Sequence, residues 1–258
     1  MTKASSLDDE TKAAIDAARA AIAQARRMVG FSGAGVSTES GVPDFRSPDS
    51  PWRRNKPIAF DLWLSSADAR AEAWRRKFAM DDIYAGAQPS RGHRAFANLV
   101  AQSRMQAIVT QNIDGLHQAA GAPSEKVIEL HGNGTYAVCL SCGARYELVD
   151  VRRRLVETSA APTCDACGGL VKSATISFGQ AMPADAMRRA ESLARDCDLF
   201  LVVGSSLVVY PAATLPVIAR RSGARVVIIN REPTELDEIA DVVVRADIGA
   251  ALAPFAAQ

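Results

Sequence analysis

Short apolar runs rich in β-branched residues alternate with helical patterns along this chain, and that alternation limits the possible folds more than any other feature. Five such runs predict strands, at residues 28–31, 107–110, 199–203, 225–229 and 242–244. Helical patterns occur at 7–26, 184–195 and 212–221. Strands that alternate with helices form a parallel sheet covered by helices on both faces. We therefore expect an α/β fold.

Two stretches interrupt this alternation. Residues 47–103 hold all three tryptophans, many charges and no clear strand, and residues 136–172 hold two pairs of cysteines. A chain of 258 residues is long enough for one large domain and a smaller module. We expect a large domain from 1–46, 104–135 and 173–258, and a small domain from 47–103 and 136–172.

Four of the five cysteines form two Cys-x-x-Cys pairs, Cys139 with Cys142 and Cys164 with Cys167, separated by 21 residues. Two such pairs are typical of a tetrahedral zinc site, and four protein ligands leave no open position for catalysis. The sequence therefore predicts a structural Zn²⁺ ion. Cys197 stands alone before an apolar run and is interpreted as a core residue.

A glycine motif, Gly33-Ala34-Gly35, follows the first predicted strand. Glycines there let the backbone approach a pyrophosphate, although tight turns use the same pattern as often. A dehydrogenase would have a third glycine and an acidic residue about 20 positions further on. A polar loop follows here instead, so a dinucleotide can bind but the usual layout for hydride transfer is missing.

Polar side chains follow the second predicted strand, at Gln111, Asn112 and Asp114. Ligands of open α/β sheets bind at the carboxyl ends of strands, where amide and carboxylate groups can hold a carboxamide and a ribose. Helix capping by Asn112 or Asp114 explains the same residues equally well.

His131 stands at a strand end before Gly132 and is a candidate general base, because the pKa of histidine lies near working pH. A structural histidine is the alternative. Of the other two histidines, His93 is interpreted as structural, and His117 is compatible with either role.

The second half of the predicted sheet carries further candidates. Gly204, Ser205 and Ser206 follow one strand and Asn230 closes the next, so that both can reach the adenosine half of a dinucleotide. Two segments predicted to be exposed, Phe178-Gly179-Gln180 and 207–211, can pair with an extended peptide by strand addition. Plain loops are the alternative there.

The net charge of +1 argues against bulk attraction to nucleic acid or to a membrane. The basic runs at 53–54, 75–77 and 152–154 are interpreted as solvated surface. The sequence has no run of about 18 apolar residues, so it predicts no membrane span. The N-terminus has no signal-peptide pattern, so a cytoplasmic location is expected.

Together these segments resemble the sirtuin family. The resemblance is carried, in the family's order, by 33–46 (GAGVSTESGVPDFR), 110–117 (TQNIDGLH), His131-Gly132, the four paired cysteines, Phe178-Gly179, Gly204-Ser205-Ser206 and Asn230. It covers roughly residues 29–252, nearly the whole chain.

The resemblance implies a Rossmann-type large domain with a small domain made of a zinc ribbon and a helical module. NAD and an acylated-lysine protein or peptide would enter the cleft from opposite sides. NAD would be consumed, with nicotinamide released and the acyl group transferred to ADP-ribose. Deacetylation is the expected activity. A mono-ADP-ribosyltransferase shares the first step and stays open as the alternative, whereas a dehydrogenase and a nucleic-acid-binding zinc ribbon fit less well.

The resemblance also implies roles for particular residues. The catalytic residues would be His131, acting as base, and Asn112. Asn112 and Asp114 would hold the nicotinamide end beside Ala34 and Val42, and a mobile loop at 44–46 would close over NAD. The implied NAD contacts are Gly33, Ala34, Gly35, Thr38, Asp44, Phe45, Arg46, Gln111, Asn112, Asp114, Gly204, Ser205, Ser206, Asn230 and Ile248. The implied peptide contacts are Phe178, Gly179, Val208 and Tyr210.

Three details concern the peptide and the acyl group. Gln180 stands where the family commonly has glutamate, and residues 173–177 lack a proline often found there. Family members that prefer succinyl groups carry a Tyr-x-x-Arg pair. In this chain we place Glu72 at the tyrosine position and Arg75 at the arginine position. Because Glu72 would repel an acyl carboxylate, neutral acyl groups are expected to be preferred. A solvent-facing ion pair is the alternative for Glu72 and Arg75.

Overall fold

A computed structural model describes residues 8–45 and 47–257. Its larger sheet has six strands, all paired in parallel, in the order β3-β2-β1-β7-β8-β9. This is the strand order of a Rossmann fold, which confirms the predicted fold class. The strands are β1 (Met28–Ser32), β2 (Met105–Thr110), β3 (Val127–Glu129), β7 (Leu199–Val203), β8 (Arg225–Ile229) and β9 (Val242–Val244).

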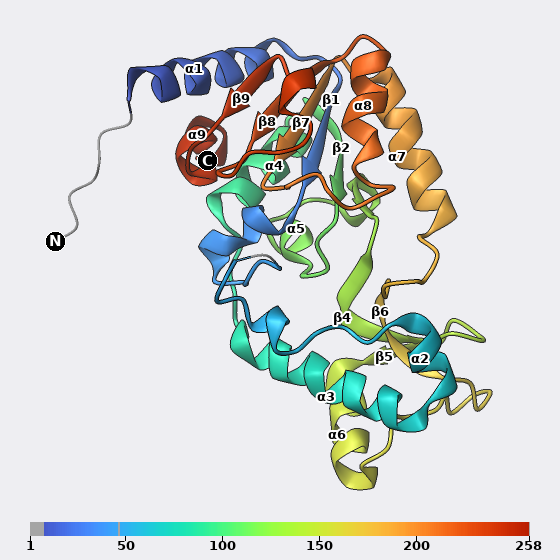
Figure 1. Cartoon of the computed structure of the whole chain (residues 1–258). Coiled ribbons are helices and arrows are strands. Elements are labelled where there is room, and N and C mark those ends of the chain that lie inside the picture. The colour runs from blue at the N-terminus through green and yellow to red at the C-terminus, as the bar shows by residue number, and fades with distance from the viewer. Residues whose placement is uncertain (1–7, 46, 258) are drawn as a thin grey trace, which may run out of the picture.

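Helices cover both faces of this sheet (Figure 1). Side chains of successive strand residues point to opposite faces, so Leu201 packs on one side of β7 and Phe200 on the other. The first face is covered by α1 (Asp9–Gln24), α4 (Arg91–Ala101), α9 (Ile248–Ala251) and α10 (Ala253–Ala256). The second face is covered by α7 (Ala184–Asp196) and α8 (Thr214–Arg221), and Cys197 is buried there, as expected of a core residue.

A smaller lobe lies at the other end of the molecule (Figure 1). Its antiparallel sheet has the order β5-β4-β6, formed by β4 (Gly132–Cys139), β5 (Arg145–Glu147) and β6 (Val171–Thr175). Three helices belong to this part of the fold, α2 (Phe60–Ser65), α3 (Ala67–Ile83) and α6 (Leu148–Thr158). Trp74 and Phe78 of α3 pack with Val151 and Leu155 of α6 and with two of the cysteines, so helices and zinc ribbon share one core.

Packing divides the chain at slightly different points from the expected boundaries. Helix α4 falls within residues 47–103, yet its Phe96 and Leu99 pack in the core of the large sheet together with Met28 and Ile108. Strands β4 and β6 extend beyond residues 136–172, because Gly132 pairs with Thr175. A division by packing would assign α4 to the large lobe and the whole of both strands to the small one.

The remaining elements are short. They are α5 (Leu116–Ala119) and the 3₁₀ helices η1 (Ala34–Ser40), η2 (Pro51–Arg53), η3 (Ser124–Lys126) and η4 (Asp237–Ile239). A 3₁₀ turn thus stands where a dehydrogenase would have a long crossover helix. Within the described residues, no helix has the length and apolar character needed to cross a membrane.

Candidate active site

The carboxyl ends of β1 and β7 meet where the strand order reverses, which is where open α/β sheets bind ligands. The loops after these strands touch backbone to backbone. The Gly35 N–H donates to the Gly204 carbonyl at 2.8 Å, and a Cβ atom added at Gly33 would lie 2.7 Å from the same oxygen. At Gly204, with φ of +65°, a Cβ would lie 2.4 Å from the Val36 nitrogen. Only glycine fits these positions, so bare backbone lines this end of the sheet.

Ser37 of η1 connects the predicted polar residues. The Asn112 side-chain amide donates to Ser37 Oγ at 3.0 Å and to the Gly33 carbonyl at 3.2 Å. Ser37 Oγ in turn donates to Asp114 Oδ2 at 2.7 Å. Gln111 reaches the neighbouring strand end, where its amide donates to Ser205 Oγ at 2.8 Å. The structure therefore brings the polar residues predicted after the second strand, Gln111, Asn112 and Asp114, to the glycine loops.

Two buried histidines lie behind this cluster. His93 Nδ1 accepts the Ser90 N–H at 3.1 Å, so its proton is on Nε2, which lies 3.3 Å from Ser37 Oγ. Burial lowers the pKa of His93 to about 4, so the ring is uncharged at neutral pH. His117 is buried beside it, with Nε2 at 2.7 Å from Ser32 Oγ, and burial lowers its pKa as well. The two buried rings therefore contact the site through Ser37 and Ser32.

His131 is held at its ring and at its backbone. Nδ1 lies 2.9 Å from the Gln111 carbonyl, which can only accept, so Nδ1 carries the proton and Nε2 has a free lone pair in the neutral ring. Burial lowers the pKa of His131, which favours this neutral form. The His131 carbonyl accepts the Ile176 N–H at 2.8 Å. The ring is therefore oriented in the tautomer that a general base at Nε2 requires.

A cavity of about 430 Å³ opens beside Asp114. Val42, Ile113 and Leu116 line it from the large lobe, and Asp81 and Tyr84 at the end of α3 line it from the small lobe. Its charged side chains are mostly acidic, and the one arginine, Arg152, pairs with Asp82 at 2.7 Å.

Glu72 and Arg75 do not line this cavity. They pair with each other at 3.0 Å on the exposed side of α3. This arrangement fits the solvent-facing alternative for the pair.

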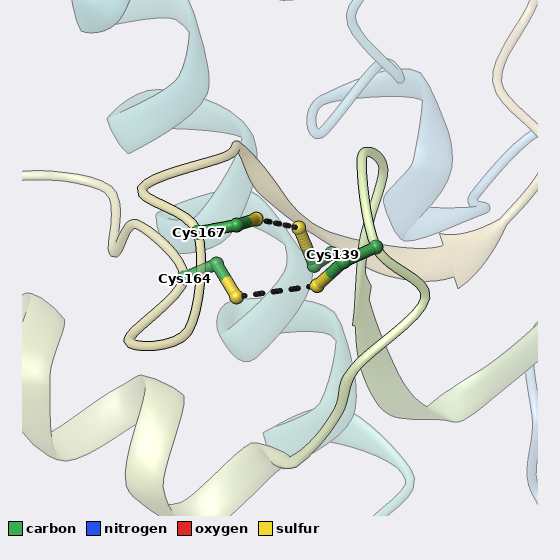
Figure 2. Close-up of side chains that lie close together, drawn as sticks. Cys139, Cys164 and Cys167 are labelled. Atoms are coloured by element: carbon green, nitrogen blue, oxygen red, sulfur yellow. Dashed lines mark hydrogen bonds between the residues drawn. The ribbon is translucent and has the colours of Figure 1, made fainter.

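The four paired cysteines converge in the small lobe, with all four Sγ atoms within 4.8 Å of one another. The sulfur atoms face each other in two pairs, Cys139 with Cys167 at 3.5 Å and Cys142 with Cys164 at 3.6 Å. Figure 2 shows both pairs, with Cys139, Cys164 and Cys167 labelled. These separations are far too long for disulfide bonds of about 2 Å. They suit four thiolates around a tetrahedral zinc ion with Zn–S bonds of about 2.3 Å.

Comparison with known proteins agrees with this geometry. The model of the Sir2 family matches residues 33–211. An NAD-dependent protein deacetylase of Rhodopseudomonas palustris is 59% identical over 234 residues, which cover 91% of this chain and 92% of that protein. The chain belongs to the Sir2 family.

Other members of the Sir2 family extend the comparison. An NAD-dependent protein deacylase of Pyrobaculum aerophilum is 45% identical over 90% of both chains. A solved Sir2 structure with a p53 peptide and NAD⁺ has 38% identity and a TM-score of 0.81, covering 93% of this chain and 96% of that one. A Sir2 enzyme bound to a propionylated peptide gives the same identity, TM-score and coverage.

The loop after η1 carries further implied NAD contacts of this sirtuin. Asp44 accepts the Ser47 N–H at 2.7 Å, and the ring of Phe45 stacks on Trp52 with centroids 4.5 Å apart. Arg46 lies outside the described residues. Thr38 is within η1, where its hydroxyl donates to the Gly35 carbonyl at 3.0 Å.

Two implied contacts for adenosine lie at the far strands. Asn230 follows β8, and its side-chain amide donates to the Glu232 carbonyl at 2.7 Å. Ile248 begins α9 after the N-cap Asp247. Both positions are at carboxyl ends of strands, on the same edge of the sheet as the glycine loops.

The two segments assigned to the peptide are exposed. Phe178 is 65% exposed, Tyr210 59% and Val208 37%, which are high values for large apolar side chains. The Phe60 N–H donates to the Phe178 carbonyl at 3.0 Å, so the start of α2 holds this loop. The Gln180 side chain accepts the Ser177 N–H at 3.2 Å and is thus part of the loop's own turn.

Sequence reasoning missed several residues of the site. Ser37 was within a recognised motif, but its central place between Asn112 and Asp114 depends on contacts across two loops. Asp81 and Tyr84 follow no motif that could have indicated them. Lys172 was also missed, because the sequence predicted no strand at 171–175, where β6 lies.

Proposed function

We propose that this sirtuin is an NAD-dependent protein-lysine deacylase, with acetyl-lysine as its principal substrate. The observation that carries the proposal is His131, whose ring presents an unprotonated Nε2 beside the strand ends that carry the glycine loops. The printed names of relatives at up to 59% identity, NAD-dependent protein deacetylases and deacylases, support it. They favour deacylation over mono-ADP-ribosyl transfer.

NAD supplies the ribose carbon that takes the acyl oxygen when its bond to nicotinamide breaks. The bare backbone at Gly33, Gly35 and Gly204 suits the pyrophosphate, since a Cβ at any of them would meet backbone. Asn112 and Asp114 are held rigidly through Ser37 and would bind the nicotinamide end next to the 430 Å³ cavity. The remaining contacts would be those that the family resemblance implies.

His131 would remove a proton from a ribose hydroxyl at its Nε2 atom. The Gln111 carbonyl holds the proton on Nδ1 and would stabilise the imidazolium that forms, because a carbonyl can accept from the charged ring as well as from the neutral one. The lowered pKa of His131 keeps the ring in its basic form at neutral pH. General-base catalysis of this kind typically contributes about 10²–10⁴-fold.

The acyl-lysine peptide would lie as an extended strand between the exposed loops at Phe178 and Val208, with Tyr210 beside it. Zinc would serve folding, because four thiolates close its coordination sphere. A cytoplasmic location belongs to the proposal, since free thiols of this kind persist in a reducing compartment.

The test is mass spectrometry of acetylated, propionylated and succinylated peptides incubated with NAD. Deacylation predicts loss of the acyl mass from the peptide only when NAD is present, with nicotinamide and O-acyl-ADP-ribose formed in equal amounts. A gain in peptide mass equal to ADP-ribose would support the transferase instead. Unchanged peptides in the presence of NAD would refute the proposal.

A further inference from the structure

Lys172 is a buried lysine on β6 that none of the functions assigned above uses. Only 4% of the residue is exposed to solvent. The ammonium Nζ donates to the Thr175 carbonyl at 2.6 Å and lies 3.4 Å from the Ser173 carbonyl. On the other side it lies 6.0 Å from the ring centroid of Phe60, the first residue of α2. The charge is therefore surrounded by two carbonyl groups and one aromatic ring.

Among residues 8–45 and 47–257, no carboxylate pairs with this ammonium. The neighbours facing it are uncharged: its strand partner on β4 is Val138, α2 presents Phe60, and β6 presents backbone carbonyls. Burial is accordingly the sole cause that lowers the pKa of Lys172, to about 8. A buried cation without a counter-ion destabilises a fold, so stability does not explain this residue.

The hydrogen bonds of Lys172 lead to the proposed base. The Thr175 carbonyl and the Ile176 N–H belong to one planar peptide group. Lys172 donates to the oxygen of that peptide group, and the N–H of the same group, from Ile176, donates to the His131 carbonyl at 2.8 Å. One rigid plane therefore lies between the ammonium and the backbone of His131. A charge-assisted bond to the oxygen also polarises the plane and strengthens the bond that its N–H makes.

The contacts of Lys172 lead equally to the peptide loop. Phe60, whose ring faces the ammonium, donates its N–H to the Phe178 carbonyl at 3.0 Å. Figure 1 shows α2 beside the three-stranded sheet that contains β6. Lys172 thus contacts, through one intermediate each, the residue assigned as base and the loop assigned to the peptide.

We propose that Lys172 is a positioning residue for deacylation, whose charged ammonium fixes the His131 backbone relative to the Phe178 loop. The inference rests on the proposed function. It requires the ammonium to be charged, because a neutral amine makes a weaker bond to the Thr175 carbonyl and loses its attraction to the Phe60 ring.

The test compares Lys172→Met, Lys172→Arg and the wild type on an acetylated peptide with NAD, and uses Lys126→Met as the matched control. Lys126 is an exposed lysine on η3, away from these contacts. Lys172→Met should lower kcat by about 10- to 100-fold, since misplacing a reacting group by about 1 Å costs up to about 10²-fold. The KM for NAD should change little, and Lys126→Met should behave as wild type.

The pH profile separates positioning from a general structural role. Wild-type activity should fall as pH rises through about 8, where Lys172 loses its proton. Lys172→Arg should restore most of kcat and keep it above that pH, because arginine stays charged.

Wild-type kcat in folded Lys172→Met would overturn the inference, and so would an unchanged alkaline limb in Lys172→Arg. If Lys172→Met does not fold, the alkaline limb of Lys172→Arg decides by itself. A wild type without NAD-dependent deacylation would refute the proposed function, whereas an active wild type with an equally active Lys172→Met would refute this inference alone.

Discussion

Gly132 follows the proposed base directly, and replacing it with alanine tests how tightly β6 presses on β4. Its φ is +71°, and an added Cβ would lie 2.0 Å from the Ala174 carbonyl oxygen. That oxygen is backbone and cannot rotate away as a side chain would. The two strands must therefore separate by about 1.5 Å before the contact becomes an ordinary one.

The magnitude follows from three contributions. An L-residue in the left-handed region costs roughly 1–2 kcal/mol. Separating the strands also weakens the Ile176 to His131 hydrogen bond of 2.8 Å, worth about 1 kcal/mol, and leaves some residual overlap. Gly132→Ala should therefore lower the free energy of unfolding by about 2–4 kcal/mol. Because His131 moves with its neighbour, kcat should fall by up to about 10²-fold.

The assay is urea unfolding followed by circular dichroism, together with steady-state kinetics. Gly223→Ala is the matched control, because Gly223 has φ of +91° and nothing within 4 Å of an added Cβ. Gly223→Ala should lower the free energy of unfolding only by the cost of the left-handed conformation, about 1–2 kcal/mol, and should leave kcat unchanged. Equal losses of stability in the two variants, with full activity in Gly132→Ala, would refute the close contact between β6 and Gly132.

Four further predictions follow from the site and the small lobe. His131→Ala should keep its thermal melt and lose about 10²–10⁴-fold in kcat; near-normal turnover would exclude it as base. Tyr146→Phe removes the 3.1 Å hydrogen bond to Cys164 Sγ, so this variant should release zinc to a chelating dye faster than the control variant Tyr136→Phe does. Equal rates of zinc release would show that Tyr146 does not help to hold the metal. Lys172→Met should be more stable than wild type by up to about 3 kcal/mol at pH 7. This gain should shrink between pH 8 and about 10.5, because the buried charge destabilises the wild type until its proton leaves; urea unfolding at several pH values measures it. Acetyl-lysine should give a higher kcat/KM than succinyl-lysine on one peptide, because the arginine that lines the cavity, Arg152, is already paired with Asp82 and would not neutralise an acyl carboxylate if the cavity receives the acyl group; the reverse order would contradict this.

Five strands of the large sheet were predictable because each is a short run rich in apolar residues, and the run at 199–203 is buried along its whole length. The zinc ligands were predictable because spacing alone defines Cys139 and its three partners. The short strand β3 has too few residues to give such a signal, and α8 begins at Thr214 rather than directly after Pro211.

Contacts between distant segments could not be predicted in the same way. Helix α4 lies within a stretch without strands, and only its packing with Met28 and Ile108 shows which core it joins. Helix α3 has no fixed motif, so the sequence could not locate which of its residues meet the cavity; Asp81 and Tyr84 line it and Glu72 does not. Lys172 depends on a peptide plane between β6 and His131, which no local pattern encodes.

The shared core of the small lobe links the metal to the cleft. Trp74 and Phe78 pack with Cys139 and Cys164, and the helix that carries them ends at the cavity beside Asp114. Loss of zinc should therefore loosen α3 and weaken NAD binding at a distance. Thermodynamic reciprocity then requires bound NAD to strengthen zinc binding by the same factor. When zinc is scarce in the cell the enzyme should therefore bind NAD less tightly, and when NAD is scarce it should bind zinc less tightly.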